Sequence, residues 1–216
     1  MSDLDMMMAV RAMRRPAFLT GELAVGSGRS ASATVQALSR LERAGLVLKV
    51  CRGVWADSAN GALSPYSVIP YLFPRNRAYV SFISALHLYG IIEQIPQVIT
   101  LAAAIHTKTI RTRVGTFFVH QIAPTFFKGF DWYKKEGSFL IAEPEKALID
   151  CLYVSARRKN QFSHFPELRF SPKFSFSKAR GWAGKVPDSN TKKHVLARLE
   201  EILKTRNRLN DMEVLK

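Results

Sequence analysis

The sequence predicts an α+β protein of two domains, and three observations lead to that prediction. Helical and strand-like patterns alternate along 216 residues without internal repeats. A stretch rich in Ser, Asn, Gly and Pro separates two patterned regions and is typical of a linker. Charge is unevenly distributed, since Lys and Arg exceed Asp and Glu by 3 in residues 1–60 and by 12 in residues 61–216. We therefore expect one domain over residues 1–58 and a second over residues 66–216.

The excess of basic residues limits the kinds of partner. Lys and Arg number 32 against 17 Asp and Glu, which gives a formal net charge of +15 at pH 7. A field of that size attracts polyanions, which are nucleic acids or acidic membrane surfaces. The N-terminus has Asp3 and Asp5 in place of the basic start of a signal peptide, and no run of about 18 apolar residues occurs. The sequence thus favours a cytoplasmic protein that binds nucleic acid and no membrane.

The first domain is predicted from helix caps, glycine turns and apolar spacing. In chain order, the expected elements are a helix over 4–15 ended by Pro16, a short helix capped by Thr20, a turn at 26–28, a longer helix over 30–44 closed by Gly45, and strands at 46–50 and 54–56. This order is that of a winged helix-turn-helix, with the hairpin as the wing.

The longer helix has one apolar and one polar face. Its apolar stripe consists of Ala31, Val35, Leu38 and Leu41. With that stripe inward, the outward side chains are those of Ser32, Gln36, Arg40 and Arg43. Such a face suits the major groove of DNA, although winged domains that bind only protein also occur, and a polar helix face is often merely solvated.

Ten residues are the candidate DNA contacts of this domain. Arg29 suits guanine and Gln36 suits adenine, because their side chains match the donor and acceptor pattern of those base edges. Hydroxyl and cationic side chains of the helix-turn-helix suit phosphates, and those of the wing suit backbone or minor groove. The full set is Thr20, Ser27, Arg29, Ser30, Ser32, Gln36, Arg40, Arg43, Lys49 and Arg52.

The second domain alternates helical and strand-like patterns. The expected elements are a helix over 79–89 with Ser81 as its cap, strands over 98–103, 108–114, 117–122 and 138–142, a helix that begins at Glu143-Pro144, and a helix over 191–206. Together they predict a mixed α/β domain with a small, largely antiparallel sheet.

Basic residues interleaved with aromatic ones form a second candidate surface. Arg111 and Arg113 are two apart in a predicted strand and so share a face. This candidate second basic face comprises Lys108, Arg111, Arg113 and Lys128, with Lys134 and Lys135 as further neighbours. It would extend the DNA footprint, meet a protein partner or its RNA substrate, or simply be a solvated face.

Acidic residues around one lysine raise the question of catalysis. The group consists of Glu143, Glu145, Lys146 and Asp150. Their spacing along a helix start argues against a metal-dependent nuclease and favours Glu143 as a cap and Lys146 in ion pairs with Glu143 and Asp150. The two cysteines and five histidines have no zinc-site spacing, and no phosphate-binding loop occurs. We expect no metal, no cofactor and no enzymatic activity.

Two segments resemble a known family. "YVSFISALHLYGIIEQIPQVITLA" (79–102) and "FLIAEPEKALIDCLYV" (139–154) are similar to the AbiEi-type antitoxins of bacterial type IV (abortive infection, AbiE-like) toxin–antitoxin systems, and the resemblance covers roughly residues 15–206. It implies an N-terminal winged helix, a C-terminal antitoxin domain and autorepression at inverted repeats in the promoter. It also implies neutralisation of a nucleotidyltransferase toxin, often without a stable complex.

Two other functions stay open. One is a transcription regulator whose second domain senses a ligand or partner and that has no toxin. The other is an enzyme acting on nucleic acid, with the first domain used for targeting. No heptad pattern demands a dimer, so we expect a monomer or weak dimer that pairs on DNA.

Overall fold

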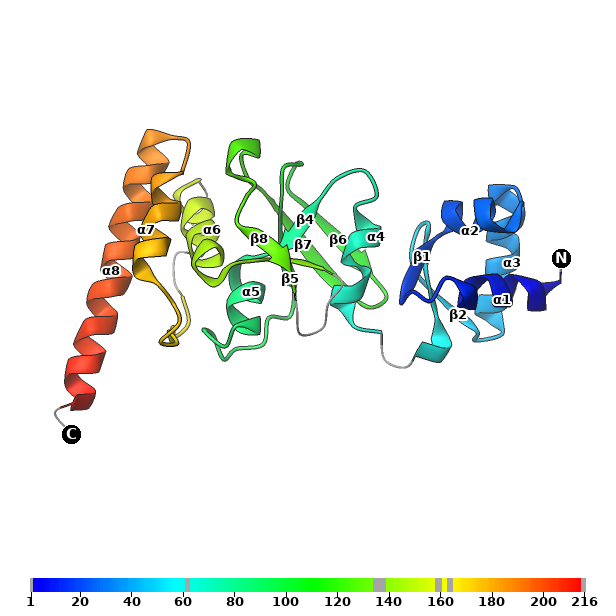
Figure 1. The fold of residues 1–216 in the computed structure, drawn as a ribbon, viewed down its shortest axis with the longest axis horizontal. Coiled ribbons are helices and arrows are strands. Elements are labelled where there is room, and N and C mark those ends of the chain that lie inside the picture. The colour runs from blue at the N-terminus through cyan, green and yellow to red at the C-terminus, as the bar shows by residue number, and fades with distance from the viewer. Residues whose placement is uncertain (1, 61–62, 134–138, 158–160, 163–164, 215–216) are drawn as a thin grey trace. The chain divides into compact units, whose positions relative to one another are not determined.

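The chain folds into two compact units (Figure 1). The computed structural model describes residues 2–60, 63–133, 139–157, 161–162 and 165–214. The first unit comprises Met1–Arg77 and Ile110–Thr116, and the second comprises Ala78–Thr109 and Phe117–Lys216. The unit boundary thus differs from the one expected between residues 58 and 66.

The first unit begins with three helices and a three-stranded sheet. Its elements are α1 (Asp3–Ala12), β1 (Ala17–Leu19), α2 (Thr20–Ser27), α3 (Ala31–Arg43), β2 (Val47–Cys51), β3 (Val54–Asp57), the 3-10 turns η1 (Ser58–Asn60) and η2 (Pro65–Val68), and α4 (Ile69–Leu72). Because α4 contacts β1, the first unit continues past the expected linker.

The helices of this unit enclose a core with the sheet. The strand order is β1-β3-β2, and both pairings are antiparallel. The core includes Met6, Val10, Phe18, Leu38 and Trp55, each at most 3% exposed. Each such side chain contributes about 1.5–3 kcal/mol relative to an exposed one, so this small unit has its own apolar core.

The rest of the chain contains a larger sheet and four helices within its described part. The elements are β4 (Ala78–Val80), α5 (Phe82–Leu88), β5 (Ile99–Ala103), β6 (Lys108–Thr112), β7 (Gly115–Gln121), η3 (Pro124–Phe126), β8 (Phe130–Trp132), β9 (Leu140–Ala142), α6 (Pro144–Arg157), α7 (Phe176–Gly184) and α8 (Ser189–Val214).

The sheet is larger than predicted and is mixed. It has six strands in the order β6-β7-β5-β4-β9-β8. The pairs β4–β5 and β8–β9 are antiparallel, whereas β4–β9 and β5–β7 are parallel. The prediction of a small, largely antiparallel sheet was therefore wrong, because β4 and β8 were not anticipated and they extend the sheet through its centre and at one edge.

β4 overlaps the start of the segment predicted as one helix over 79–89. All three of its residues are buried, so the strand shows no alternation of apolar and polar positions. A strand of three residues beside a helix is too short to show a period of two. The helix begins only after Ser81, whose extended backbone (φ −148°) makes it the N-cap.

Three helices pack together after β9. α6 begins at Pro144, as predicted, and contacts both α7 and α8. α7, which was not predicted, has Ser175 as its N-cap, with the backbone N–H of Lys178 donating to the hydroxyl. α7 and α8 lie side by side (Figure 1). α8 is longer than the predicted helix over 191–206, and Val195 and Leu199 on it are buried.

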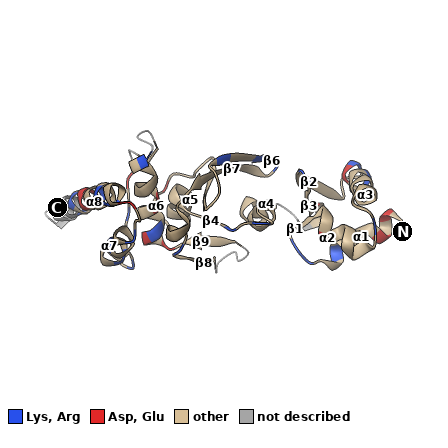
Figure 2. Ribbon diagram, turned by 90° about the horizontal axis from the view of Figure 1, so that it is seen from above, with Lys and Arg blue, Asp and Glu red and all other residues tan. Residues whose placement is uncertain are grey.

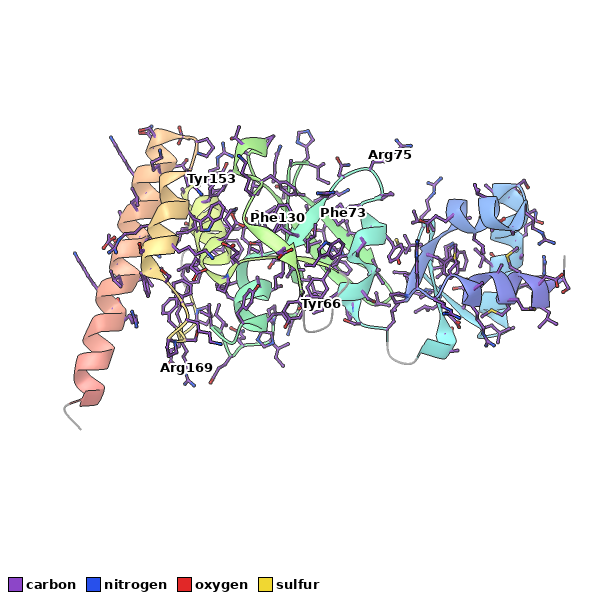
Figure 3. All side chains as sticks on the ribbon, viewed as in Figure 1. Tyr66, Phe73, Arg75, Phe130, Tyr153 and Arg169 are labelled. Carbon is purple, nitrogen blue, oxygen red and sulfur yellow. The ribbon has the colours of Figure 1, made fainter. Side chains whose placement is uncertain are left out.

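Aromatic side chains fill the interior between the sheet and α6. The ring of Phe130 on β8 stacks on Tyr79 on β4 with centroids 4.5 Å apart, and Phe126 lies 5.2 Å from Tyr153 on α6. Figure 3 shows Phe130 and Tyr153 among the side chains of this region. Of the aromatic residues interleaved with basic ones over residues 126–133, Phe126 and Tyr133 are thus core residues, whereas Trp132 is 57% exposed.

Candidate nucleic-acid interface

α3 is fixed at its start by a turn and a cap. Gly28 ends α2 in the left-handed conformation (φ +64°), which costs little at a glycine. The hydroxyl of Ser30 then accepts the backbone N–H of Ala33 at 3.2 Å, so Ser30 is the N-cap of α3. The predicted DNA contact Ser30 therefore already has a structural role, and its side chain is exposed.

The buried stripe of α3 differs from the predicted one. It consists of Thr34, Ala37, Leu38 and Leu41, whereas Val35 is 41% exposed and Ala31 is exposed. Thr34 tolerates burial because its hydroxyl donates to the carbonyl of Ser30 at 3.0 Å. The prediction that Ala31 and Val35 face inward was wrong because this local hydrogen bond allows a polar residue to take the inward position.

The predicted polar face of α3 is nevertheless exposed. Ser32, Gln36, Arg40 and Arg43 are all exposed and recur at spacings of four, four and three, which places them along one side of the helix. Figure 2 shows both basic and acidic positions on this helix. We call Ser32, Val35, Gln36, Arg40 and Arg43 the outer face of α3.

Arg40 forms an ion pair with an acidic residue of α1. The guanidinium of Arg40 donates to both carboxylate oxygens of Asp3, from Nη2 at 2.7 Å and from Nε at 3.1 Å. This hydrogen bond lowers the pKa of Asp3 and raises that of Arg40. Sequence reasoning missed Asp3 as a neighbour of the outer face because the two residues are 37 positions apart.

The other predicted contacts of α2 and α3 lie at the turn between the two helices and at the end of α3. Arg29 is half-buried between α2 and α3, and Ser27 donates its hydroxyl to the carbonyl of Ala24 at 3.3 Å. Arg43 donates from Nε to the carbonyl of Ser39 at 3.4 Å. Ser27 and Arg29 thus lie just before the start of α3, and Arg43 lies at its end.

Thr20 is buried and so cannot contact a DNA phosphate as predicted. It is the first residue of α2, whose N-cap is Leu19, so the prediction of Thr20 as the N-cap was wrong. Its hydroxyl accepts a hydrogen bond from the indole N–H of Trp55 at 2.9 Å, and its side chain is buried. Thr20 thus joins α2 to β3 and satisfies a buried indole donor.

The hairpin of β2 and β3 carries two cationic residues. Its turn is Arg52-Gly53, where Gly53 adopts φ +80°. Arg52 is exposed, and Lys49 is half-buried with its ammonium 5.5 Å from the ring of Trp55. Both predicted wing contacts therefore belong to the same hairpin as the tryptophan that holds α2.

The candidate second basic face is not one face. Lys108 and Arg111 are on β6, whereas Lys128 lies just before β8, at the opposite edge of the sheet. Arg113 lies in the turn after β6, not in a strand. The strand that was predicted over 108–114 ends at Thr112, which removes the shared face. Lys134 and Lys135 lie outside the described residues.

Arg113 instead belongs to the first unit. Its backbone N–H donates to the carbonyl of Val50 at 3.0 Å, and its guanidinium forms an ion pair with Glu42 of α3. The acidic residue beside the outer face is thereby neutralised, and the net charge around the C-terminal end of α3 stays positive.

The acid–lysine group of the second unit forms a buried cluster. Lys146 and Asp150 have fully buried side chains and form an ion pair one helical turn apart on α6. Asp150 also accepts the hydroxyls of Ser81 at 2.7 Å and Tyr79 at 3.1 Å. Burial lowers the pKa of Lys146, an effect that Asp150 partly offsets. The predicted pairing of Lys146 with Asp150 is confirmed.

The other predicted partner of Lys146 has different contacts. Glu143 accepts the indole N–H of Trp182 at 3.2 Å and pairs with Lys178 at 3.0 Å. Glu145 accepts the backbone N–H of Ser175 at 2.9 Å. Both acids thus tie the start of α6 to the α7 region, and the predicted Glu143–Lys146 pair is replaced by these longer-range contacts.

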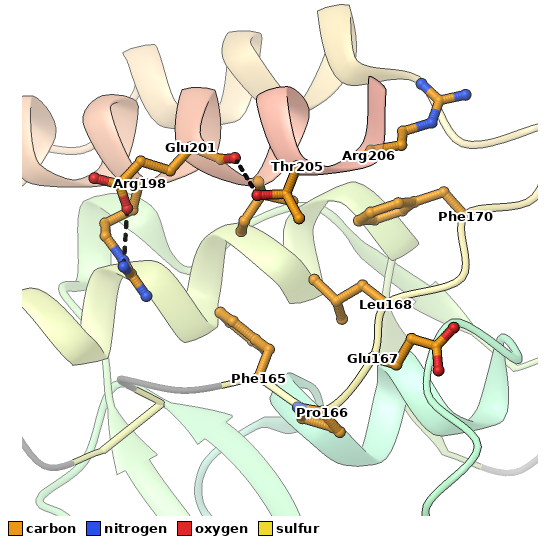
Figure 4. A pocket seen from close by; sticks show the side chains of 10 residues that line it. Phe165, Pro166, Glu167, Leu168, Phe170, Arg198, Glu201, Thr205 and Arg206 are labelled. Atoms are coloured by element: carbon orange, nitrogen blue, oxygen red, sulfur yellow. Dashed lines mark hydrogen bonds and ion pairs between the residues drawn. The ribbon is translucent and has the colours of Figure 1, made fainter. Parts of the chain in front are cut away.

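A cavity of about 500 Å3 lies beside α8 in the second unit (Figure 4). Apolar side chains from the segment before α7 and from α8 line it, with Arg198 and Glu201 paired at its edge. Its apolar residues are Phe165, Pro166, Leu168, Phe170 and Ile202. A cavity of this size and lining is within the range of small-molecule sites. The sequence showed no sign of it, because its walls come from separate segments.

Within the described residues, no three His, Cys, Asp or Glu side chains are grouped as metal ligands, and no helix is long and apolar enough to cross a membrane. No protein-family model and no curated protein sequence matches this chain.

Proposed function

We propose that this chain is a DNA-binding transcriptional autorepressor and the antitoxin of a type IV toxin–antitoxin pair. Residues 1–58 act as a winged helix-turn-helix, with α3 as the recognition helix and the β2–β3 hairpin as the wing. The observation that carries the DNA-binding part is the outer face of α3, which is exposed and, apart from Val35, made of polar and cationic side chains, and which is followed directly by a basic hairpin.

Roles on DNA follow from side-chain chemistry. Arg29 and Gln36 lie in the N-terminal half of the α3 region, the part of a recognition helix that reaches base edges. Arg43, Ser27 and Ser32 hold phosphates, and Lys49 and Arg52 of the hairpin hold backbone or minor groove. The buried Thr20 is not part of this interface.

The antitoxin part of the proposal rests on the resemblance to AbiEi-type proteins. Of the two segments that carry it, residues 79–102 span β4, α5 and β5, and residues 139–154 span β9 and most of α6. The buried Lys146–Asp150 pair lies in the second segment and holds Ser81 of the first. Both motif segments thus meet at one polar cluster, which favours a structural role for them.

In this proposal the protein acts in the cytoplasm and has no catalytic activity. It binds inverted repeats in its own promoter, as monomers or a weak dimer that pairs on the two half-sites. It also neutralises a cognate nucleotidyltransferase toxin, without a stable complex.

The DNA-binding proposal is tested by gel shift at several salt concentrations. The duplexes are the DNA immediately upstream of the gene and a scrambled copy. Specific retardation is expected for the native sequence, and Gln36→Ala and Arg43→Ala should weaken it. The matched controls are Gln97→Ala and Lys193→Ala, which alter exposed residues of the second unit. Equal affinity for both duplexes with a steep salt slope means electrostatic binding alone. No binding to either duplex refutes the proposal.

The antitoxin proposal is tested by growth. A nucleotidyltransferase gene is expected beside this one, and its induction should arrest growth unless this chain is co-expressed. Pull-down of the two proteins should recover no stable complex. If co-expression fails to restore growth although DNA binding is specific, the chain is a regulator without an antitoxin role.

The cavity beside α8 favours the second candidate, a regulator whose C-terminal domain senses a small molecule. An apolar ligand in that cavity would change the affinity for operator DNA. The test is a gel shift in the presence of anilinonaphthalene sulfonate, an aromatic anion whose fluorescence reports apolar sites. Ile202→Trp places a larger side chain in the cavity and serves as the second variant. If the dye binds but the affinity for operator DNA does not change, and if Ile202→Trp does not change that affinity either, the result argues against ligand sensing.

A further inference from the structure

Val35 is an apolar residue on a face otherwise made of polar side chains. It is 41% exposed and lies on the outer face of α3, within the helical half that also carries Ser32 and Gln36. About the helix axis, Val35 lies roughly 60° to one side of Ser32 and Gln36 roughly 40° to the other. It therefore shares the exposed surface with the side chain that suits adenine.

Nothing in the helix itself requires a valine here. A β-branched residue is a poorer helix former than alanine or the straight-chain residues, and its exposed methyl groups gain nothing in water. The nearest inward positions along the helix are occupied by Thr34 and Ala37, which are both buried. Within the described residues, Val35 is also the one large apolar side chain of α3 that is exposed.

In the major groove, the apolar feature of DNA is the C5-methyl group of thymine. We infer that Val35 contacts a thymine methyl beside the base pair read by Gln36, so that α3 selects an A·T-containing step. This inference rests on the proposed function, because it gives a specificity role to a residue of the same face. It also explains why the face is not uniformly polar.

The test replaces thymine by deoxyuridine, one position at a time, in the upstream duplex that wild type binds. Deoxyuridine removes only the methyl group and leaves base pairing intact. At the contacted position, wild type should lose about four-fold in affinity, as expected for one buried methyl group. Val35→Ala should bind more weakly overall and be insensitive to deoxyuridine at that position.

The matched control is Val25→Ala on α2, a valine that is 85% exposed. It should keep the full sensitivity to deoxyuridine. Alanine at an exposed helical position favours the helix, so neither variant is expected to unfold.

Three results would overturn the inference. The first is a wild type that is insensitive to deoxyuridine everywhere while it still prefers its own duplex. The second is a deoxyuridine effect that persists unchanged in Val35→Ala. The third is a change in oligomeric state of Val35→Ala by analytical ultracentrifugation without a deoxyuridine effect, which would assign Val35 to a protein contact. A wild type without specific binding refutes the proposed function itself, and the inference with it.

Discussion

Replacing Lys146 by methionine should strongly destabilise the second unit. Methionine keeps most of the apolar length of lysine but removes the ammonium that neutralises Asp150, and both side chains are fully buried. Breaking one partner of a buried ion pair typically costs about 3–5 kcal/mol, because the remaining charge has no compensation. For a domain of this size the midpoint of thermal unfolding should fall on the order of 10 °C.

The double variant Lys146→Met/Asp150→Asn separates loss of packing from loss of charge balance. The side-chain oxygen of asparagine carries no charge but still accepts hydrogen bonds from the hydroxyls of Ser81 and Tyr79. Without an acceptor, each of these buried hydroxyls would cost about 1–3 kcal/mol. The double variant should therefore be more stable than Lys146→Met alone, which is a coupling that two independent sites would not show.

Urea unfolding followed by tryptophan fluorescence and by far-ultraviolet circular dichroism measures these differences. Lys178→Met is the control, because Lys178 is about half exposed and its ion pair with Glu143 is screened by solvent, so it should contribute less than about 1 kcal/mol. The buried Glu145, 3.8 Å from Lys178, keeps the backbone N–H of Ser175 as a donor in this variant. A loss for Lys146→Met no larger than that of the control would refute the reasoning. Unchanged stability together with loss of a metal-dependent DNA cleavage would instead revive the enzyme alternative.

Three further outcomes are expected. Asp3→Asn should free Arg40, raise the affinity for duplex DNA and steepen the slope of log affinity against log salt by up to about 0.9, as measured by fluorescence anisotropy. Gly129→Ala should lower the thermal midpoint, because φ is +78° and a Cβ would lie 2.5 Å from Trp182 Cζ2. Burial raises the pKa of Cys51, so its alkylation by iodoacetamide, followed by mass spectrometry, should be slow at pH 7–8 and accelerate above pH 9.

Each of these outcomes has a control and a contrary result. Asp131→Asn, an exposed acid on β8, should leave DNA affinity unchanged, and an equal gain there would show a general charge effect. Gly181→Ala on α7, with no atom within 4 Å of its Cβ, should not lower the midpoint, so equal losses would contradict the clash argument. The fully buried Cys151 should react only after unfolding, and prompt reaction would contradict its burial.

Local signals carried most of what the sequence could predict. The N-terminal elements, the start of α6 at Pro144 and the exposure of Gln36 follow from caps, glycines and spacing within one turn. The buried stripe includes Thr34, whose hydroxyl donates to the carbonyl of Ser30, and the spacing of apolar residues alone does not reveal such a polar inward position.

Long-range contacts could not be predicted in the same way. Asp3 and Arg40 are 37 residues apart, and Glu42 and Arg113 are 71 apart, so no periodic pattern connects them. The strand β4 is fixed by its pairing with β5 and β9 and not by its own three residues. Contacts between distant parts of the chain therefore determine that β4 is a strand and not part of a helix. They also determine that Arg40 and Arg113 form ion pairs within the protein.

The return of residues 110–116 to the first unit has a consequence for dissecting the molecule. The backbone crosses from one unit to the other after Arg77, again at Ile110 and again after Thr116. A fragment that ends at Arg77 lacks the peptide N–H that the carbonyl of Val50 accepts and the guanidinium that Glu42 pairs with. Neither unit is formed by one continuous stretch of chain. Domain swaps between related chains must therefore exchange residues 110–116 together with the N-terminal region.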